Sequence, residues 1–449
     1  MELFQEDESC LRSSCTVTGG SYDLTAQFRT HVTGSKNAGD AGPHFRIRHN
    51  EALGITFQCS GQVRRCRLET NIDEQPFDGD LTDLVRLQIP DAQGCQGVFS
   101  MEGGHDAAAH QLHLVRHGFQ LVLIDFRPAE LVTAMDQAIN APGVEWVMVF
   151  SPNACHKEGI LAAFKAGKNV FSEKPLATTI EDCREIYEAH RASGRLFATG
   201  FVLRYAPIYR KAKEILSSGM LGKLIAIDGN ENIAPYHGGY IMCNWRRLTK
   251  MAGPHILEKC CHDLDLINWF TESIPTRVAG FGGRDFFKPE NRGLVDKFGA
   301  NTFKRWWDPH ATETPFTDDT DLMDNTVCVA EFRNRVRMTF LATMSNAIPE
   351  RRLYFSCSEG TMIVELYSRT LRYCRIGEDM VTIEFSGDGH GGGDDFIMKE
   401  LYETMTTGAA PKCSGNEGLQ SAVFALALDR AACTGQVVDL EPIWKSLGR

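Results

Sequence analysis

Residues 169–177 read NVFSEKPLA, a short apolar run followed at once by a carboxylate, an ammonium and a proline. The run Asn169–Ser172 has the length and composition of a buried strand. A lysine at the carboxyl end of a strand in an open α/β sheet lies where such sheets bind their ligands. Pro175 fixes the turn that follows Lys174, and the bond between them belongs to the class of peptide bonds that can be cis.

The segments on either side of this turn alternate between the patterns of strands and helices. Apolar runs of strand length lie at Gly143–Phe150 and Arg195–Phe201. Helical spacing follows at His156–Ala166, and a second helix is expected from the capping-box-like Thr179 to about Ala192. This alternation predicts a parallel sheet whose strands are joined by right-handed crossovers.

Length and composition describe an ordinary globular protein. A chain of 449 residues is expected to form two domains, and no apolar run approaches the roughly 18 residues that span a bilayer. The net charge of −11 argues against nucleic acid or an anionic membrane as the main partner, because both bind basic faces. The 15 scattered cysteines favour reduced thiols over a disulfide framework. The acidic N-terminus resembles no targeting signal, so we expect a cytoplasmic protein.

The front of the chain is patterned poorly. Residues 1–96 are interpreted as an atypical extension, irregular or disordered, because their apolar runs are short and weakly periodic. Residues 97–125 can be divided into a strand, a glycine turn, a helix, a second strand and an acid, at Val98–Ser100, Gly103-Gly104, Asp106–His117, Gln120–Ile124 and Asp125. That order predicts a dinucleotide-binding turn at Gly103-Gly104 with Asp125 on the ribose, although the glycines do not follow GxGxxG. An ordinary βαβ unit with a glycine turn is the alternative.

The pattern changes after Phe201. A helix is expected at Ala206–Leu216, a strand at Leu224–Asn232, a loop over Ile233–Ala252 and an apolar helix at Ile256–Phe270. Later strand-like runs follow one another without helices between them, at Arg277–Phe281, Thr326–Phe332, Val336–Ala342, Leu353–Cys357, Thr361–Leu366, Leu371–Cys374 and Val381–Phe385. Such runs predict a large, mostly antiparallel open sheet. The fold class is therefore α/β: a Rossmann-like parallel sheet in residues 97–200, then an α+β domain in residues 201–449 that ends in helices at Asp394–Thr406 and Glu417–Cys433.

Three ionisable residues, Glu258, His262 and Asp265, fall on the helix expected at 256–270. Residues three or four apart share a helical face, so all three side chains can point the same way. A carboxylate one turn before a histidine can fix its tautomer and raise its basicity, which makes a general acid or base. A group of surface ion pairs is the alternative interpretation.

Four possible metal ligands lie close together at the start of the same segment. They are His255, Cys260, Cys261 and His262. Their spacing matches no standard zinc pattern, and adjacent cysteines on a helix point in different directions. No metal is predicted.

Together these segments resemble the glucose–fructose oxidoreductase / inositol dehydrogenase / MocA family. The matching stretches are SPNACH (151–156), SEKPLATTIEDC (172–183), GFVLRYAPIY (200–209), GPHILEKCCHDLDLINW (253–269) and HGGGDD (390–395), and the resemblance extends from about Val144 to the C-terminus. It implies a Rossmann domain that binds NAD or NADP, and a second domain whose open sheet covers the substrate and forms a homodimer or homotetramer. It also implies a substrate that is a sugar, an inositol or a related polyol.

The resemblance also implies roles for individual residues. The family's catalytic lysine, histidine and helix carboxylate correspond to Lys174, His262 and Glu258, and the substrate would contact Lys174, His262 and Asp265. The cofactor contacts that the resemblance implies are Ser151, Pro152, Asn153, His156, Glu173, Lys174, Arg204, Trp245 and Arg246. The predicted turn adds Gly103, Gly104 and Asp125, in a region where the chain departs from the family pattern. Asp125 favours NAD over NADP by bonding ribose hydroxyls, although Arg127 lies close by in the sequence.

The expected chemistry is oxidation of a secondary alcohol or the reverse reduction. His262 would take the hydroxyl proton, Lys174 would stabilise alkoxide charge, and Glu258 would orient His262. Two rival interpretations remain: a catalytically inactive relative that acts as a binding or scaffold protein, and an NAD-assisted glycosidase. Retention of Lys174 favours net redox chemistry.

Overall fold

The computed structural model describes residues 131–303, 311–387 and 390–449, with side chains from residue 135 on, and the backbone of six earlier strands. These strands are β1 (Cys10–Gly19), β2 (Tyr22–His31), β3 (Gly54–Cys59), β4 (Gln62–Arg67), β5 (Leu114–Arg116) and β6 (Phe119–Ile124). The chain divides into two compact units, residues 1–108 and 109–449. In the first unit β1 to β4 form an antiparallel sheet in sequence order.

The first strands of the second unit differ from the sequence prediction. β5 pairs with β6 in an antiparallel hairpin, so residues 114–116, which the sequence placed in a helix at Asp106–His117, are strand. The predicted phosphate-binding glycines Gly103 and Gly104 and the predicted ribose ligand Asp125 lie outside the described residues. The prediction of a dinucleotide turn at these positions stays a prediction.

The parallel sheet is confirmed. β6, β7 (Val144–Val149), β8 (Asn169–Ser172) and β9 (Phe197–Thr199) are parallel neighbours in that order. The connecting helices are α1 (Leu131–Ile139), α2 (His156–Lys165) and α3 (Ile180–Ser193). The hydroxyl of Thr179 caps α3 by accepting from the Asp182 amide, and Gly194 ends the helix in the left-handed conformation.

Nine strands within the described residues form the large sheet, in the order β17-β16-β15-β14-β10-β13-β12-β11-β18. Only β10 and β13 are parallel neighbours in it, so the prediction of a mostly antiparallel sheet is confirmed. The strands are β10 (Leu224–Asn232), β11 (Pro275–Gly283), β12 (Asn325–Phe332), β13 (Arg337–Thr343), β14 (Glu350–Cys357), β15 (Gly360–Glu365), β16 (Thr370–Arg375), β17 (Val381–Glu384) and β18 (Val438–Asp439).

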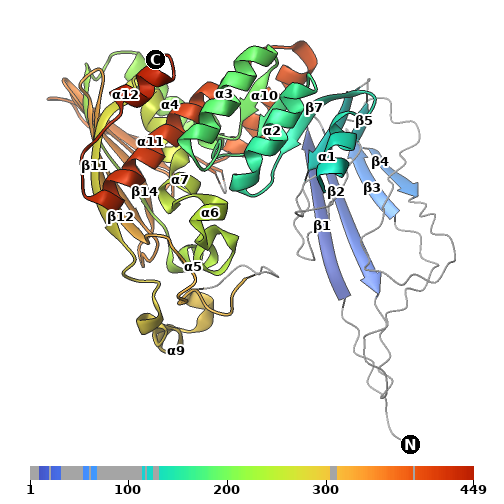
Figure 1. Ribbon diagram of the computed structural model, residues 1–449, viewed down its shortest axis with the longest axis horizontal. Helices are drawn as coiled ribbons and strands as arrows, with labels where there is room; N and C mark the ends of the chain where they lie inside the picture. Colours follow the sequence, from blue (N-terminus) through green and yellow to red (C-terminus); the bar gives the residue numbers. More distant parts are fainter. Residues whose placement is uncertain are drawn as a thin grey trace, which may run out of the picture. The chain divides into compact units, whose positions relative to one another are not determined.

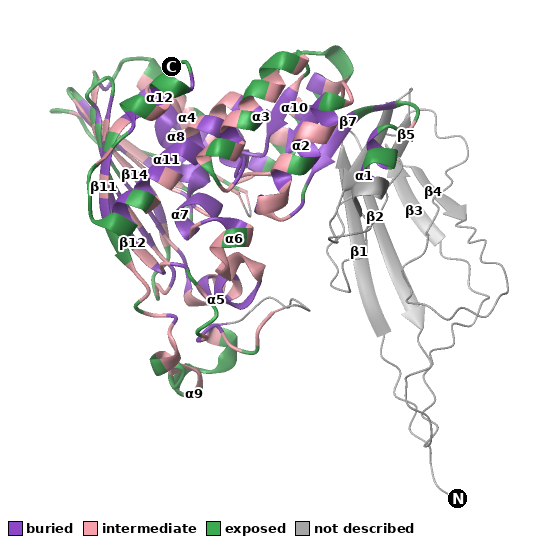
Figure 2. Ribbon diagram, viewed as in Figure 1, coloured by how far each residue is buried: buried purple, intermediate pink, exposed green. Residues whose placement is uncertain are grey.

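Helices cover one face of this sheet. α11 (Gly415–Thr434) runs along the strands in Figure 1 and contacts β11, α3 and α8 (Cys261–Thr271), which joins the two sheets of the unit. Figure 2 shows that buried residues concentrate in α11, α8 and α7 (His255–Glu258). The helices α4 (Pro207–Ser217) and α12 (Glu441–Ser446) complete this layer. α10 (Gly393–Thr407) packs instead on the parallel sheet, where Leu401 is buried with Met148 and Phe171.

The opposite face of the large sheet exposes apolar side chains. Phe281 of β11 is 71% exposed, and Val327 and Val329 of β12 are exposed beside it. No partner chain is present, so the homo-oligomer expected through this sheet stays a prediction. None of the helices in the described part of the chain has the length and apolar character needed to cross a lipid bilayer.

Two segments differ from the sequence prediction near the site. The loop predicted over Ile233–Ala252 contains α5 (Pro235–Cys243), the short turn η3 (Trp245–Arg247) and α6 (Thr249–Ala252). The helix predicted at 256–270 is broken into α7 and α8 between Glu258 and Cys261. A further short helix, α9 (Leu294–Phe298), lies in the long segment before β12.

Candidate active site

Lys174 stands at the carboxyl end of β8, where the sequence predicted a ligand-binding position. The Lys174–Pro175 peptide bond is cis. The ammonium of Lys174 donates a 2.8 Å hydrogen bond to the carbonyl oxygen of Glu258, the last residue of α7. Burial works to lower the pKa of Lys174, but the nearby negative groups, Glu258 first among them and then Cys261 and Glu173, together outweigh it and raise that pKa. Lys174 is therefore held as a cation against the break between α7 and α8.

His262 lies in the first turn of α8 and is only 3% exposed. Burial lowers its pKa well below the usual histidine value, and the positive charge of Lys174 lowers it further. Its Nδ1 has no hydrogen-bond partner among the described residues. The structure thus brings an ammonium and a neutral imidazole to one place, as the sequence predicted.

Glu258 does not hold His262 as the sequence predicted. The break after α7 turns its carboxylate toward Arg246, whose Nε donates to Oε1 at 2.9 Å. Burial would raise the pKa of Glu258, but the charges of Lys174 and Arg246 outweigh it and lower the pKa to about 2. Arg246 also stacks on the ring of Trp245, with 4.3 Å between guanidinium and ring centroid. The two residues predicted to contact cofactor or substrate, Trp245 and Arg246, therefore anchor Glu258.

Glu173 faces the segment that follows β9, at Gly200. Its Oε2 accepts from the amide of Lys174 at 3.2 Å. A Cβ on Gly200 would lie only 2.9 Å from that same oxygen. Glycine at 200 is therefore what lets the chain leave β9 beside the Glu173-Lys174 turn.

The segment after β7 supplies four predicted cofactor contacts, Ser151, Pro152, Asn153 and His156. Both ring nitrogens of buried His156 lie 2.8 Å from backbone carbonyls, those of Ser151 and Pro175. The amide of Asn153 donates to the carbonyl of Ala252. These two side chains tie the end of β7 to the lysine turn and to α6, and they hold the backbone of this edge in place.

Ser151 differs from its neighbours. Its hydroxyl is buried and has no partner among the described residues. A buried hydroxyl without a partner is costly, so this position at the carboxyl edge of a parallel sheet is suited to a ligand that completes its hydrogen bonding.

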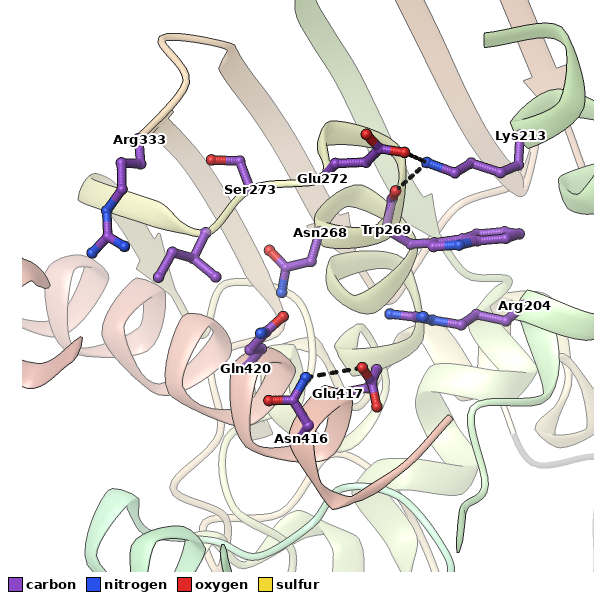
Figure 3. Close-up of a pocket in the computed structure, with 11 residues that line it drawn as sticks. Arg204, Lys213, Asn268, Trp269, Glu272, Ser273, Arg333, Asn416, Glu417 and Gln420 are labelled. Atoms are coloured by element: carbon purple, nitrogen blue, oxygen red, sulfur yellow. Dashed lines mark hydrogen bonds and ion pairs between the residues drawn. The ribbon is translucent and has the colours of Figure 1, made fainter. Parts of the chain in front are cut away.

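The predicted contacts Arg204 and Asp265 bind each other. Arg204 donates two hydrogen bonds to the Asp265 carboxylate, at 2.6 and 2.8 Å. Arg204 and Lys213 flank the ring of Trp269 on opposite sides (Figure 3). Together with Asn268, Glu272 and Glu417, these side chains line a pocket of about 440 Å³. Asp265 is thus paired with an arginine that lines this pocket.

A buried ion cluster joins α8 to the large sheet. Arg351 of β14 binds the Asp263 carboxylate with bonds of 2.8 and 2.7 Å and lies 3.1 Å from Glu231 of β10. Glu231, Cys260 and Asp263 also come close enough together to hold a metal ion. The guanidinium of Arg351 already balances both carboxylates, which favours a structural interpretation of this group.

His390 was not among the predicted site residues. Its ring centroid lies 5.9 Å from that of His262, and its Nδ1 lies 3.1 Å from Oδ1 of Asp394. The sequence signal was the segment HGGGDD, in which a histidine precedes a helix and an aspartate follows four residues later. This segment contributes to the family resemblance, but the resemblance implies no role for His390.

Comparison with known families identifies the chain. A family model described as an oxidoreductase family with an NAD-binding Rossmann fold matches residues 118–201, and the model of the GFO/IDH/MocA C-terminal domain matches residues 209–363. The two matches together span just over half of the sequence. The chain belongs to the GFO/IDH/MocA oxidoreductase family. The match to an NAD-binding model confirms the prediction of a nicotinamide dinucleotide cofactor, NAD or NADP.

Characterised proteins resemble this family member over different lengths. The chain is 26% identical to 1,5-anhydro-D-fructose reductase of Ensifer adhaerens over 321 residues, 69% of this chain and 84% of that protein. It is 39% identical to inositol 2-dehydrogenase of Pseudomonas fluorescens over 132 residues, but this match spans only 29% of the chain and 36% of that enzyme.

A solved structure confirms the fold of this GFO/IDH/MocA protein. The structure of levoglucosan dehydrogenase with NADH and levoglucosan aligns with a TM-score of 0.57 and 18% identity. The alignment covers 71% of this chain and 89% of that one. Similarity at this level of identity concerns the fold alone.

Proposed function

We propose that this protein is an NAD(P)-dependent dehydrogenase or reductase that transfers a hydride between the nicotinamide and a secondary alcohol or ketone of a sugar, an inositol or a related polyol. The observation that carries the proposal is the pairing of a cationic Lys174 with a neutral, buried His262. Oxidation of an alcohol needs a base for the hydroxyl proton and a positive charge for the developing alkoxide, and these two groups supply them.

The residues at the sheet edge fit the cofactor of this family. Ser151 offers an unpaired hydroxyl, and Lys174 is partly exposed at the end of the next strand. Ser151, Pro152 and the Glu173-Lys174 turn are the segments that would hold the dinucleotide. Bound there, NAD(P) supplies the hydride-accepting or hydride-donating carbon of the nicotinamide ring.

Each side chain has a distinct task in the proposed reaction. Lys174 already donates to a backbone carbonyl, and its remaining N–H groups can bind the substrate oxygen and stabilise its negative charge. His262 accepts the hydroxyl proton, because its lowered pKa keeps the imidazole unprotonated. Glu258 remains ionised and fixes Lys174 and Arg246. Glu258 therefore acts on Lys174, whereas the sequence analysis expected it to orient His262.

The names of the relatives support the substrate class. Inositol 2-dehydrogenase and 1,5-anhydro-D-fructose reductase are named for a polyol and for a sugar-derived ketone. Both names describe reactions that interconvert a carbinol and a carbonyl, the chemistry for which Lys174 and His262 are suited.

The test has two stages. Thermal shift and tryptophan-to-NADH energy transfer, measured with NAD and NADP at up to millimolar concentration, should show cofactor binding. A panel of inositols, aldoses and anhydrosugars should then give absorbance of the reduced nicotinamide with at least one member. Cofactor binding without turnover on any alcohol or ketone would favour an inactive binding protein, and no binding at all would refute the proposed function.

A further inference from the structure

We infer that His390 and Asp394 form a relay that carries the substrate proton between the buried His262 and solvent. The inference rests on the proposed function and adds to it a path that the reaction needs. Oxidation of an alcohol leaves one proton in the site for every turnover. His262 is 3% exposed, so a proton that it accepts has no open route to water.

The geometry places a second imidazole directly beside the first. The rings of His262 and His390 have centroids 5.9 Å apart and are tilted by 45°. This spacing is slightly larger than that of two directly hydrogen-bonded imidazoles, so one water molecule or a small ring rotation completes the path. The side chain of His390 is 44% exposed, which opens the far end of the path to solvent.

Asp394 prepares His390 for this task. The carboxylate oxygens of Asp394 lie 3.1 and 3.2 Å from Nδ1 of His390. A carboxylate can only accept a hydrogen bond, so Nδ1 carries the hydrogen and Nε2 is left as the proton acceptor. The carboxylate also stabilises the imidazolium that forms while the proton passes.

The glycines of the HGGGDD segment explain how His390 reaches His262. Gly391 and Gly392 have φ of 67° and 79°, which L residues with side chains rarely adopt. A Cβ on Gly393 would lie 2.5 Å from the carbonyl oxygen of Val202. The three glycines therefore let the chain fold tightly against the segment after β9, and this fixes the position of His390.

Other charged groups around the two histidines favour transfer of the proton from His262 to His390. Glu173 at the end of β8 feels the positive charge of His390, which works to lower the Glu173 pKa against a larger raising effect of burial. Lys174, from the same turn, disfavours an imidazolium at His262. A proton on His262 is therefore driven toward His390, where Glu173 and Asp394 supply negative charge.

The atoms balance without any further reactant. The C–H electron pair leaves with the proposed hydride transfer, and the O–H proton moves to His262. The imidazolium of His262 releases one proton to Nε2 of His390, and His390 releases it to water. Both histidines return to the neutral form, and the net products are the ketone, the reduced cofactor and one solvent proton. Reduction of the ketone runs the same path inward.

Chemical rescue by small bases tests the relay. In dilute buffer, His390→Ala should lower kcat by about 10- to 100-fold, and added imidazole should restore it in proportion to its concentration. Wild type should not respond to imidazole. The solvent isotope effect on kcat should rise in the variant, because proton exit becomes slow. A loss of turnover that imidazole does not restore, or no loss at all, would overturn the relay.

Two further variants separate the relay from structural effects. His390→Gln keeps a donor toward Asp394 but cannot carry a proton, so it should fold like wild type and lose turnover as His390→Ala does. Asp394→Asn should lower kcat by a smaller factor. Asp395→Asn removes a similar charge from the same helical turn and should leave kcat unchanged; an equal effect of the two would contradict the assignment.

One measurement separates the relay from the reaction. The hydrogen bond from His390 lowers the pKa of Asp394, so His390→Ala should raise that pKa toward its ordinary value in a carbon-13 NMR titration. An unchanged Asp394 pKa would overturn the relay whatever the activity. A wild type that binds cofactor but turns over no alcohol or ketone would instead refute the proposed function.

Discussion

The two ends of helix α8 hold charged residues in different ways. Arg204 binds Asp265 midway along the helix and Lys213 binds Glu272 at its carboxyl end, so each charge meets its opposite within hydrogen-bond distance. At the amino end the Lys174 ammonium donates one hydrogen bond to a backbone carbonyl, and the buried Nδ1 of His262 has no hydrogen-bond partner among the described residues. Closed pairs are expected of structural residues, whereas incompletely bonded groups with shifted pKa values are expected where chemistry occurs.

The largest effect should follow removal of either group at the amino end. Lys174→Ala or His262→Ala should lower kcat/KM for the best polyol by about 10³-fold or more, because each removes charge stabilisation or proton transfer in the transition state. Reduced-nicotinamide absorbance measures the rate, and circular dichroism should show an unchanged fold. Turnover that persists in both variants would remove the distinction between the two ends of α8.

A stability effect is expected from the buried ion cluster, to which Asp263 contributes from the first turn of α8. Arg351→Met leaves the carboxylates of Asp263 and Glu231 buried without their cation. Breaking a buried pair in this way costs about 3–5 kcal/mol of unfolding free energy. Urea denaturation followed by fluorescence checks this value. A cost below about 1 kcal/mol would mean that the cluster is not held in solution as it is described.

The pH dependence of kcat/KM should show whether His262 is buried as described. Burial and Lys174 lower its folded pKa, so the imidazole stays neutral as pH falls through the ordinary histidine value of about 6.5 and is protonated only well below it. The rate of alcohol oxidation should therefore show no acid limb centred near that value. An acid limb near 6.5 that His262→Asn abolishes would show an imidazole in an ordinary, solvated environment.

The smallest effect should come from the carboxyl end. Lys213→Ala breaks the pair with Glu272, whose side chain is 73% exposed. A pair this open to water contributes less than about 1 kcal/mol to stability, and it touches neither Lys174 nor His262. Unfolding and turnover should both stay close to wild type, which makes this variant the matched control for Lys174→Ala. A large loss of turnover in Lys213→Ala would show that the carboxyl end of α8 also takes part in the reaction.

Much of the fold could be predicted because local signals agree with the tertiary structure. β8 begins and ends where its apolar run does, and Thr179 and Gly194 set the ends of α3. The strands of the large sheet alternate between buried and exposed residues, as in β12 and β13, and this period is visible in sequence. Lys174 and His262 could be paired because the family resemblance joined two motifs that are 88 positions apart.

The remaining differences come from long-range contacts. The break between α7 and α8 falls at Lys259 and Cys260, which carry no glycine or proline signal; Cys260 is fully buried there and Lys259 points toward Glu231. α5 lies in a segment that was predicted as loop, and it contains Gly238 and Gly239. Those glycines are needed because a Cβ at 239 would collide with the backbone oxygen of Phe303, which no local pattern reveals.

The position of β10 in the large sheet has a consequence for synthesis of the chain. Both neighbours of β10 come much later in the sequence: Asp228 bonds Thr339 of β13, 111 residues further on, and β14 follows β13. The strand therefore leaves the ribosome with two open edges and no partner for either. The domain cannot close until β14 has been made, so its folding is late and dominated by non-local contacts, and any truncation before residue 350 leaves an unpaired strand as a template for aggregation.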